Sequence, residues 1–235
     1  MTTASAGGAQ PDREEHRPIR EEHSPIVDRA STAPSHRPST APIRSGEHRT
    51  ESSGEHRTRF STAQALRGFV RDVPDFPKPG IVFKDLTPLF GDPDALRAAT
   101  EDVAAYAESI SADFVVSAEA RGFVLGGAVA ARAGLGFIPA RKPGKLPSET
   151  DSVRYELEYG VDALEVHTDS LSEGARVLVH DDLLATGGTA RALCDLVEGA
   201  GATVAGCAFV VELAFLGGRA RLQPYDVHSL ISYED

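Results

Sequence analysis

One segment, residues 176–191, constrains the fold of this chain most strongly. Its sequence is Arg-Val-Leu-Val-His-Asp-Asp-Leu-Leu-Ala-Thr-Gly-Gly-Thr-Ala-Arg. The apolar run Val177–Val179 predicts a buried parallel strand that ends at two adjacent carboxylates, Asp181 and Asp182. A turn of small residues follows, and a helical pattern begins near Ala190. A buried strand followed at once by a helix is typical of α/β proteins with a parallel sheet.

The same segment carries the groups that can hold a sugar phosphate. The paired carboxylates can accept hydrogen bonds from the vicinal hydroxyls of a sugar. The turn offers unpaired backbone N–H groups and two hydroxyls to a phosphate, and the dipole of the following helix favours an anion there. Neither a Gly-x-x-x-x-Gly-Lys-[Ser/Thr] loop nor a Gly-x-Gly-x-x-Gly fingerprint after a strand occurs. The residues expected at the phosphate are Ala185, Thr186, Gly187, Gly188 and Thr189.

The first 60 residues differ in composition from the rest of the chain. They contain almost no large apolar side chains and repeat short polar motifs, such as Ser-Gly-Glu-His-Arg-Thr at 45–50 and 53–58. Such a segment cannot bury enough apolar surface to offset its conformational entropy, so we expect a disordered tail over 1–60. Five of the eight histidines lie there at irregular spacing, which argues against a specific metal site. A single folded domain is expected over 61–235.

The net charge of −11 belongs entirely to that folded part, because residues 1–60 contain nine Arg and nine Asp or Glu. So acidic a protein is a poor nonspecific partner for nucleic acids or anionic membranes. No apolar run approaches the roughly 18 residues of a membrane span, and the N-terminus lacks the apolar region of a signal peptide. Cys194 and Cys207 lie in apolar contexts and predict buried thiols rather than a disulfide. We therefore expect a cytoplasmic protein.

From residue 61 on, helical and strand patterns alternate, which predicts a parallel sheet with right-handed crossovers. Ligands of such sheets bind beyond the carboxyl ends of the strands. The predicted helices cover Ala63–Val70, Asp94–Ser109 (with Asp94 at its start), Phe123–Ala133 and the residues from Ala190 on. The predicted strands are Phe114–Ser117, Gly136–Ala140, Val177–Val179, Thr203–Val211 and Val227–Ile231.

Two basic segments follow predicted strands at this edge of the sheet. In Glu119-Ala-Arg-Gly122, Arg121 is placed to form bidentate hydrogen bonds with phosphate oxygens. In Pro139–Pro147, a turn at Pro143-Gly144 would aim three cations at one pyrophosphate. Each segment by itself also fits an ordinary surface loop. The three cations are Arg141, Lys142 and Lys145.

A Pro-rich segment, residues 75–88, is too restricted conformationally to form a helix. Phe83 within it could stack on a planar base, while backbone groups beside it recognise the edge of that base. A loop that merely covers the core is the plainer alternative.

Residues 146–154 are polar and turn-prone, and the alternation of apolar residues over 155–160 resembles the edge of a half-exposed strand. Alternatively, a mobile loop bearing Glu158 and Tyr159 closes over the substrate and excludes water. Exclusion of water would matter for an activated sugar, which would otherwise be hydrolysed.

Together these segments resemble the adenine phosphoribosyltransferases, a family of type I phosphoribosyltransferases, over roughly residues 69–233. Residues 176–191 are similar to the family's site for phosphoribosyl pyrophosphate (PRPP). The resemblance implies the parallel-sheet type I phosphoribosyltransferase fold with a small N-terminal hood over the purine site, and a homodimer. It also implies a Mg²⁺-dependent pentosyltransferase of purine salvage that converts adenine and PRPP into AMP and pyrophosphate. Mg²⁺ would be held mainly by substrate oxygens and water, without a direct protein ligand.

The resemblance also implies roles for single residues. Asp181 and Asp182 would hold the ribose and stabilise positive charge on it, Glu158 would handle the purine proton, and Tyr159 would belong to the closing loop. It further implies a strained or cis peptide bond at Glu119–Ala120, and Arg141 matches a basic residue that reaches the site of the partner subunit. The residues implied at the pyrophosphate are Glu119, Ala120, Arg121, Arg141, Lys142 and Lys145. Those implied at adenine are Val82, Phe83, Lys84 and Leu183.

The chain departs from the family pattern at two positions. Lys84 stands where many relatives have Arg, and Ala120 where some have Ser. Because a Lys cannot reproduce bidentate guanidinium contacts, the role of side chain 84 stays open.

Two alternative functions also stay open. A transferase for hypoxanthine or xanthine would share the PRPP segment, but such enzymes usually present a side chain to the 6-oxo group of the base. Recognition of a 6-amino group by the backbone suits adenine. A regulator that binds PRPP without chemistry would usually carry a folded DNA-binding module, and the sequence shows none.

Overall fold

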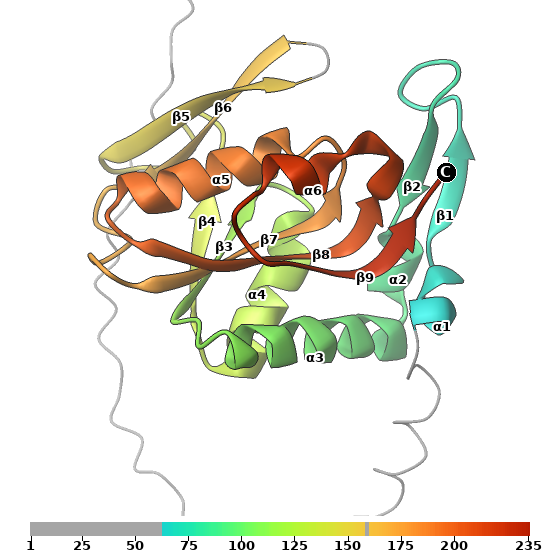
Figure 1. The fold of residues 1–235 in the computed structure, drawn as a ribbon, viewed down its shortest axis with the longest axis horizontal. Helices are drawn as coiled ribbons and strands as arrows, with labels where there is room; N and C mark the ends of the chain where they lie inside the picture. The colour runs from blue at the N-terminus through green and yellow to red at the C-terminus, as the bar shows by residue number, and fades with distance from the viewer. Residues whose placement is uncertain (1–62, 158–159) are drawn as a thin grey trace, which may run out of the picture. The chain divides into compact units, whose positions relative to one another are not determined.

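The computed structural model describes residues 63–157 and 160–235, which form an α/β fold around a five-stranded parallel sheet (Figure 1). The tail predicted for residues 1–60 lies outside the described residues, as do Glu158 and Tyr159. In spatial order the strands are β4 (Gly136–Ala140), β3 (Phe114–Ala118), β7 (Arg176–Leu184), β8 (Thr203–Leu213) and β9 (Val227–Tyr233). Every neighbouring pair runs parallel, so the predicted fold class is confirmed.

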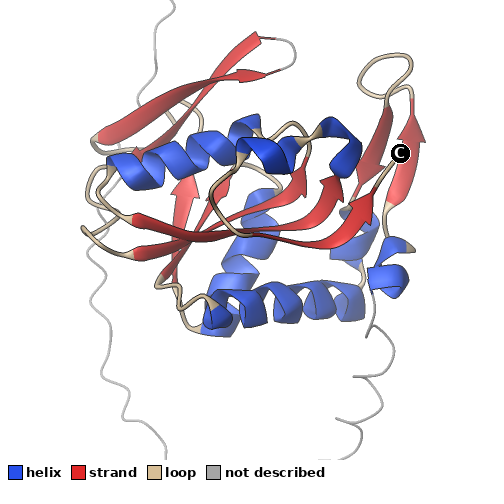
Figure 2. Cartoon of the chain, in the orientation of Figure 1, coloured by secondary structure: helices blue, strands red, loops and turns tan. Residues whose placement is uncertain are grey.

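Helices cover both faces of this sheet (Figure 2). One face packs against α5 (Gly188–Gly199), and the other packs against α3 (Pro93–Ser109) and α4 (Gly122–Ala133). Val177 and Val179 of β7 join the core beneath α5, whereas Leu178 joins the core beneath α3 and α4. The apolar run of β7 is thus buried on both faces, as expected for a central parallel strand. None of the helices in the described part of the chain is long and apolar enough to span a membrane.

Helix α3 begins at Pro93, one residue earlier than predicted. The side chain of Asp92 accepts hydrogen bonds from the backbone N–H groups of Asp94 and Ala95, at 3.0 and 2.9 Å. Pro93 occupies the first helical position, where the missing N–H of a proline costs nothing. Asp92 is therefore the N-terminal cap, and the prediction that Asp94 starts the helix is wrong.

An antiparallel hairpin of β5 (Thr150–Leu157) and β6 (Gly160–His167) packs against α5 and lies beside β4 (Figure 1). The prediction of a turn-prone segment over 146–154 is wrong from Thr150 on, and strand β6 was not predicted. Leu164 and Val166 are buried in the core under α5, while the polar residues Ser152 and Arg154, which alternate with the partly buried Val153 and Tyr155, are exposed. An antiparallel hairpin with one solvated face accommodates such polar residues.

Residues 63–91 form a small N-terminal part beside β9. It contains α1 (Ala63–Arg67), β1 (Arg71–Pro74), β2 (Val82–Asp85) and α2 (Thr87–Gly91). Strands β1 and β2 form an antiparallel hairpin, and among the described residues neither pairs with another strand. The Pro-rich segment 75–88 therefore supplies the turn of this hairpin, β2 and the first residues of α2. The prediction that this segment is not helical is wrong only at its end, where Pro88 lies in the first turn of α2.

A short connection joins β8 to β9. It consists of the 3₁₀ turn η2 (Ala214–Leu216) and the helix α6 (Gly218–Arg221), neither of which was predicted. Helix α6 lies on the same face of the sheet as α5 (Figure 1).

The two cysteines lie in the core between α5 and β8. Cys194 and Cys207 are buried free thiols whose Sγ atoms are 3.8 Å apart. The contact with Cys207, together with burial, raises the pKa of the Cys194 thiol far above its ordinary value. The prediction of buried thiols is confirmed.

Candidate active site

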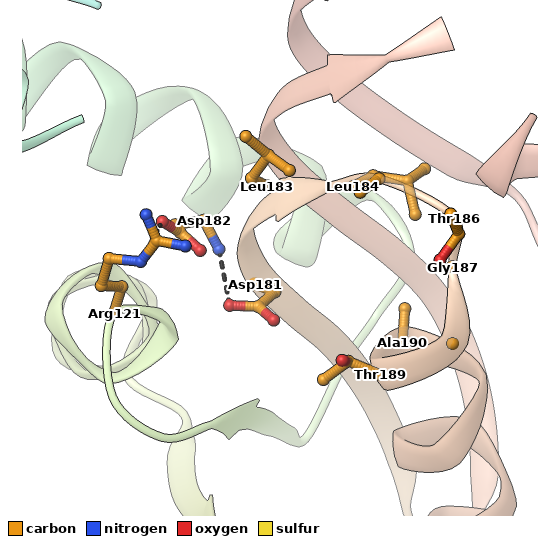
Figure 3. Close-up of a pocket in the computed structure, with 11 residues that line it drawn as sticks. Arg121, Asp181, Asp182, Leu183, Leu184, Thr186, Gly187, Thr189 and Ala190 are labelled. Atoms are coloured by element: carbon orange, nitrogen blue, oxygen red, sulfur yellow. Dashed lines mark hydrogen bonds and ion pairs between the residues drawn. The ribbon is translucent and has the colours of Figure 1, made fainter. Parts of the chain in front are cut away.

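The acidic pair lies within β7 rather than beyond its end. Pairing with β8 continues through Asp181 as far as Leu184, so the predicted strand end at Val179 was too early. The backbone of a strand can remain paired where its side chains turn polar, because the ladder uses only N–H and C=O groups. Figure 3 shows Asp181 and Asp182 beside Arg121, which stands at the start of α4.

A cavity of about 370 Å³ lies at the carboxyl end of β7. Its lining residues are Arg121 and the continuous run from Asp181 to Ala190, which includes all five residues predicted for the 5′-phosphate (Figure 3). Gly187 has a φ of 81°, a left-handed conformation that glycine adopts without strain, and it turns the chain into α5. No side chain of the described residues caps the start of α5, so its first N–H groups are available to an anion.

A second cavity, of about 250 Å³, adjoins the first one. Arg121, Asp181, Asp182 and Thr189 line both. The remaining walls are Ala118, Glu119, Ala120, Lys142, Tyr155, Asp162 and Leu164. The loop after β3 and the β5–β6 hairpin therefore both face the acidic pair. The peptide bond between Glu119 and Ala120 is cis, in agreement with the resemblance.

Burial dominates the electrostatics of the acidic pair. It raises the pKa of Asp181 well above its ordinary value, and the neighbouring charge of Asp182 adds to that effect. Burial also raises the pKa of Asp182, but the Arg121 guanidinium opposes it, with Nε 3.2 Å from Asp182 Oδ2. That oxygen has no hydrogen-bond partner within the described part of the chain. A desolvated carboxylate pair with unused acceptor capacity is suited to bind ligand hydroxyls or to face a developing cation.

Two of the predicted pyrophosphate cations reach the cavities. Arg121 lines both, and Lys142 lines the smaller one. Lys142 Nζ lies 3.1 Å from Asp162 Oδ2, and this contact raises the pKa of the Lys142 ammonium. Its side chain remains 57% exposed, so the ammonium is accessible to a ligand.

The other two cations lie elsewhere. Arg141 Nη2 is 2.8 Å from Glu119 Oε2, and the backbone N–H of Lys142 donates to Glu119 Oε1 at 2.7 Å. These contacts hold the pKa of Glu119 below its ordinary value. Lys145 is exposed and lines neither of the two cavities. Arg141 thus forms an ion pair with Glu119, and Lys145 lies outside both cavities.

Two of the residues predicted at adenine lie next to Arg121. The Phe83 ring centroid is 5.1 Å from the guanidinium carbon of Arg121, and Leu183 lines the larger cavity. Val82, just before Phe83 on β2, is 50% exposed. These residues bring an apolar surface to the rim of the polar site.

Lys84 faces away from Phe83, Leu183 and Val82. Its ammonium lies 2.7 Å from Asp72 Oδ1 on β1 and 4.2 Å from the centroid of the Tyr233 ring. Only 11% of the Lys84 side chain is exposed. The side chain therefore joins the N-terminal hairpin to the end of β9.

Sequence reasoning missed Asp162 and Leu164, which come from β6. Apolar and polar residues do not alternate regularly over 161–166, so only the short run Leu164-Glu-Val166 could have indicated this strand. Gly122 lies close to the acidic pair, because a Cβ there would lie 2.7 Å from Asp181 Oδ1. Among residues 63–157 and 160–235, no group of three or more His, Cys, Asp or Glu side chains is arranged to hold a metal ion.

Comparison with known proteins gives consistent matches. The family model for the phosphoribosyl transferase domain matches residues 94–230. The adenine phosphoribosyltransferase of Rubrobacter xylanophilus is 59% identical over 175 residues, which cover 74% of this chain and 95% of the relative. That of Nitrosococcus oceani is 57% identical over 170 residues, which cover 72% of this chain and 99% of the relative.

Solved structures agree with these matches. The crystal structure of the adenine phosphoribosyltransferase from Thermoanaerobacter pseudethanolicus has a TM-score of 0.71 and 49% identity, and the match covers 73% of this chain and 100% of that one. The Saccharomyces cerevisiae enzyme, complexed with an imino-altritol bisphosphate and adenine, has a TM-score of 0.70 and 38% identity, with coverage of 73% and 99%.

Proposed function

The chain belongs to the adenine phosphoribosyltransferase family, and from this premise we propose that it transfers the phosphoribosyl group of PRPP to adenine. The products are AMP and pyrophosphate, so the chain is a pentosyltransferase of purine salvage. The observation that carries this function is the meeting of the acidic pair, the phosphate loop (residues 185–189) and Arg121 around one cavity.

The phosphate loop is assigned to the 5′-phosphate of PRPP. The free N–H groups at the start of α5 and the hydroxyls of Thr186 and Thr189 surround that end of the cavity. The ribose then lies over Asp181 and Asp182, whose carboxylates accept hydrogen bonds from its hydroxyls. The pyrophosphate extends toward Arg121 and Lys142, which line the adjoining cavity.

The residues of the site fit a hydrated Mg²⁺. The oxygens of Asp181 and Asp182 are hard donors, and one buried Asp182 oxygen lacks a hydrogen-bond partner within the described part of the chain. When bound, Mg²⁺ would neutralise negative charge on the pyrophosphate oxygens. We assign its direct ligands to substrate and water, with the acidic pair accepting hydrogen bonds from that shell.

The chemistry follows from charge development on the sugar. As the bond between C1′ and pyrophosphate breaks, positive charge builds on C1′ and the ring oxygen, as in other glycosyl transfers. The desolvated carboxylates of Asp181 and Asp182 stabilise this charge more strongly than they would in water. Arg121 and Lys142 stabilise the opposite charge on the leaving pyrophosphate.

Adenine is assigned to the rim formed by Phe83 and Leu183, with the backbone of Val82 recognising its edge. On this assignment the N-terminal hairpin serves as the hood over the purine. Lys84 contributes indirectly, because its contacts with Asp72 and Tyr233 fix β2 in place. Glu158 and Tyr159 are assigned to the purine proton and the closing loop on the resemblance alone.

A homodimer is also proposed, on the resemblance at Arg141. The Arg141 side chain is 35% exposed beside the smaller cavity, where it holds Glu119. Light scattering at micromolar concentration would test the dimer, and a mass of one chain would contradict it.

The decisive experiment incubates the purified protein with PRPP, Mg²⁺ and each purine base in turn. We expect AMP from adenine and no nucleotide from hypoxanthine or xanthine. Chelation of Mg²⁺ should abolish the product. Nucleotide from another base would support the alternative substrate, and PRPP binding without any product would support the regulator.

A matched variant tests the acidic pair. Asp182→Asn should weaken the use of PRPP while the protein stays folded, as followed by circular dichroism. Loss of the folded state would show instead that the pair is structural.

A further inference from the structure

The phosphate loop packs backbone to backbone against residues 217–219, here called the backing turn, which lead from η2 into the first residues of α6. A Cβ on Gly218 would lie 2.2 Å from the carbonyl oxygen of Ala185 and 3.0 Å from the backbone nitrogen of Gly187. Conversely, a Cβ on Gly187 would lie 2.7 Å from the carbonyl oxygen of Gly218. Because Cβ contacts under 3.0 Å essentially never occur, neither side of this crossing can accept a side chain without movement of the backbone.

An ion pair between Arg219 and a buried carboxylate, Glu212, holds the backing turn in place. Arg219 donates to both carboxylate oxygens of Glu212, at 2.9 and 2.5 Å, and to the carbonyl oxygen of Val227 at 2.7 Å. The side chain of Glu212 is only 6% exposed, and Arg219 holds its pKa below the ordinary value. Glu212 belongs to β8 and Val227 to β9. One guanidinium therefore ties the backing turn to two strands of the sheet.

The phosphate loop faces the cavity on one side and the backing turn on the other. On one side Ala185 and Gly187 line the cavity, and on the other side they touch Gly218. Backbone N–H groups bind a phosphate well only if they are held in place before the ligand arrives. The backing turn prevents the loop from moving away from the cavity, and the two backbones come this close because Gly187 and Gly218 both lack a side chain.

From this geometry we infer that Gly218 is a positioning residue for the 5′-phosphate of PRPP, with Arg219 and Glu212 as its anchors. The inference rests on the proposed function, because it assigns to the phosphate loop the ligand named there. It adds that the affinity for PRPP depends on a segment that lies more than twenty residues beyond the PRPP motif in the sequence.

Gly218→Ala tests the inference directly. The added methyl group displaces Ala185 or Gly187, so KM for PRPP should rise about 10-fold, the effect of losing one hydrogen bond to a charged group. KM for adenine and kcat at saturating PRPP should change less than about twofold. Gly199→Ala is the matched control: it lies at the other end of α5, its Cβ would meet nothing within 4 Å, and its kinetics should equal those of the wild type.

A second variant loosens the anchor without touching the loop. Arg219→Lys keeps a cation beside Glu212 but loses the bidentate geometry, so KM for PRPP should rise about threefold. Circular dichroism melts of each variant show whether it is folded at the assay temperature. If Gly218→Ala is unfolded there, Arg219→Lys carries the test with the same measurements.

Measuring the affinity for ribose 5-phosphate by calorimetry tests this inference independently of the proposed function. The affinity of Gly218→Ala for it should fall about 10-fold, whether or not the wild type forms AMP. Wild-type affinity for ribose 5-phosphate and wild-type KM for PRPP in the folded variant would overturn the inference. Equal losses in the KM values for adenine and PRPP would overturn it too, because they would indicate general damage rather than a positioned phosphate.

Discussion

The buried imidazole of His180 makes the stability of the fold depend on pH in a way that can be measured. His180 lies on β7 immediately before the acidic pair and is completely buried. Its Nδ1 lies 2.9 Å from the carbonyl oxygen of Ala208, so Nδ1 carries the proton and donates it. Burial lowers the pKa of His180 from 6.5 to about 4. The imidazole is therefore neutral in the folded protein throughout the physiological range.

The sign of the effect follows from the direction of this shift. Below pH 6.5 the unfolded chain binds a proton at this position, whereas the folded protein does so only near a pKa of about 4. The contribution of the neutral imidazole to the free energy of unfolding is complete above pH 6.5 and is lost as the pH falls toward 4. The full difference is about 3 kcal/mol, and about 2 kcal/mol of it is lost by pH 5.

His180→Asn isolates this contribution. Asn places an N–H donor near the position of Nδ1 but does not titrate. Urea unfolding of both proteins at pH 7.5 and pH 5 should show that the wild type loses about 2 kcal/mol more than the variant. All other titrating groups are common to both proteins and cancel in this difference. Equal losses of unfolding free energy in the two proteins would refute the reasoning. Between pH 7.5 and 8.5 the difference in unfolding free energy between wild type and variant should be constant.

Three further outcomes are expected. Asp181→Asn should raise the melting temperature of the ligand-free protein while weakening the use of PRPP, because it removes a charge that burial disfavours; a lower melting temperature would contradict this. Glu158→Gln should lower kcat about 100-fold with both substrates saturating, and an unchanged kcat would reject its role as the proton-handling group. Cys194 and Cys207 should react with an aromatic disulfide reagent only after unfolding in guanidinium, since both are buried; rapid reaction of the native protein would show that the core opens.

The central sheet was predictable because its strands are apolar on both faces. Runs such as Val177–Val179 and Thr203–Val211 have few alternatives to a buried strand when helical patterns separate them. The two hairpins were not predictable on this basis. Strand β5 carries polar residues on a solvated face, and β1 is only four residues long, so the packing of these segments outweighs their local sequence signal.

The residues of the site also differ in whether the sequence could place them. Residues 181–189 could be placed together because they are contiguous and turn into one helix start. Lys84 could not be placed, since its partners Asp72 and Tyr233 come from separate parts of the chain. Gly218 could not be found either, because its role depends on a backbone crossing that exists only once β8 and α6 have been formed.

The strand order separates two parts of the molecule that can change independently. From β3 the chain moves outward to β4, and from β7 it moves the other way to β8 and β9, so the cavity lies where the two directions diverge. Within residues 63–157 and 160–235, the β1–β2 hairpin forms no strand pairing with the main sheet. Residues 71–85 can therefore be exchanged for those of another family member without shifting the register of the main sheet. Under the proposed assignment of the purine to this hairpin, grafting that one short segment would alter which base is accepted and leave the site for the activated sugar unchanged.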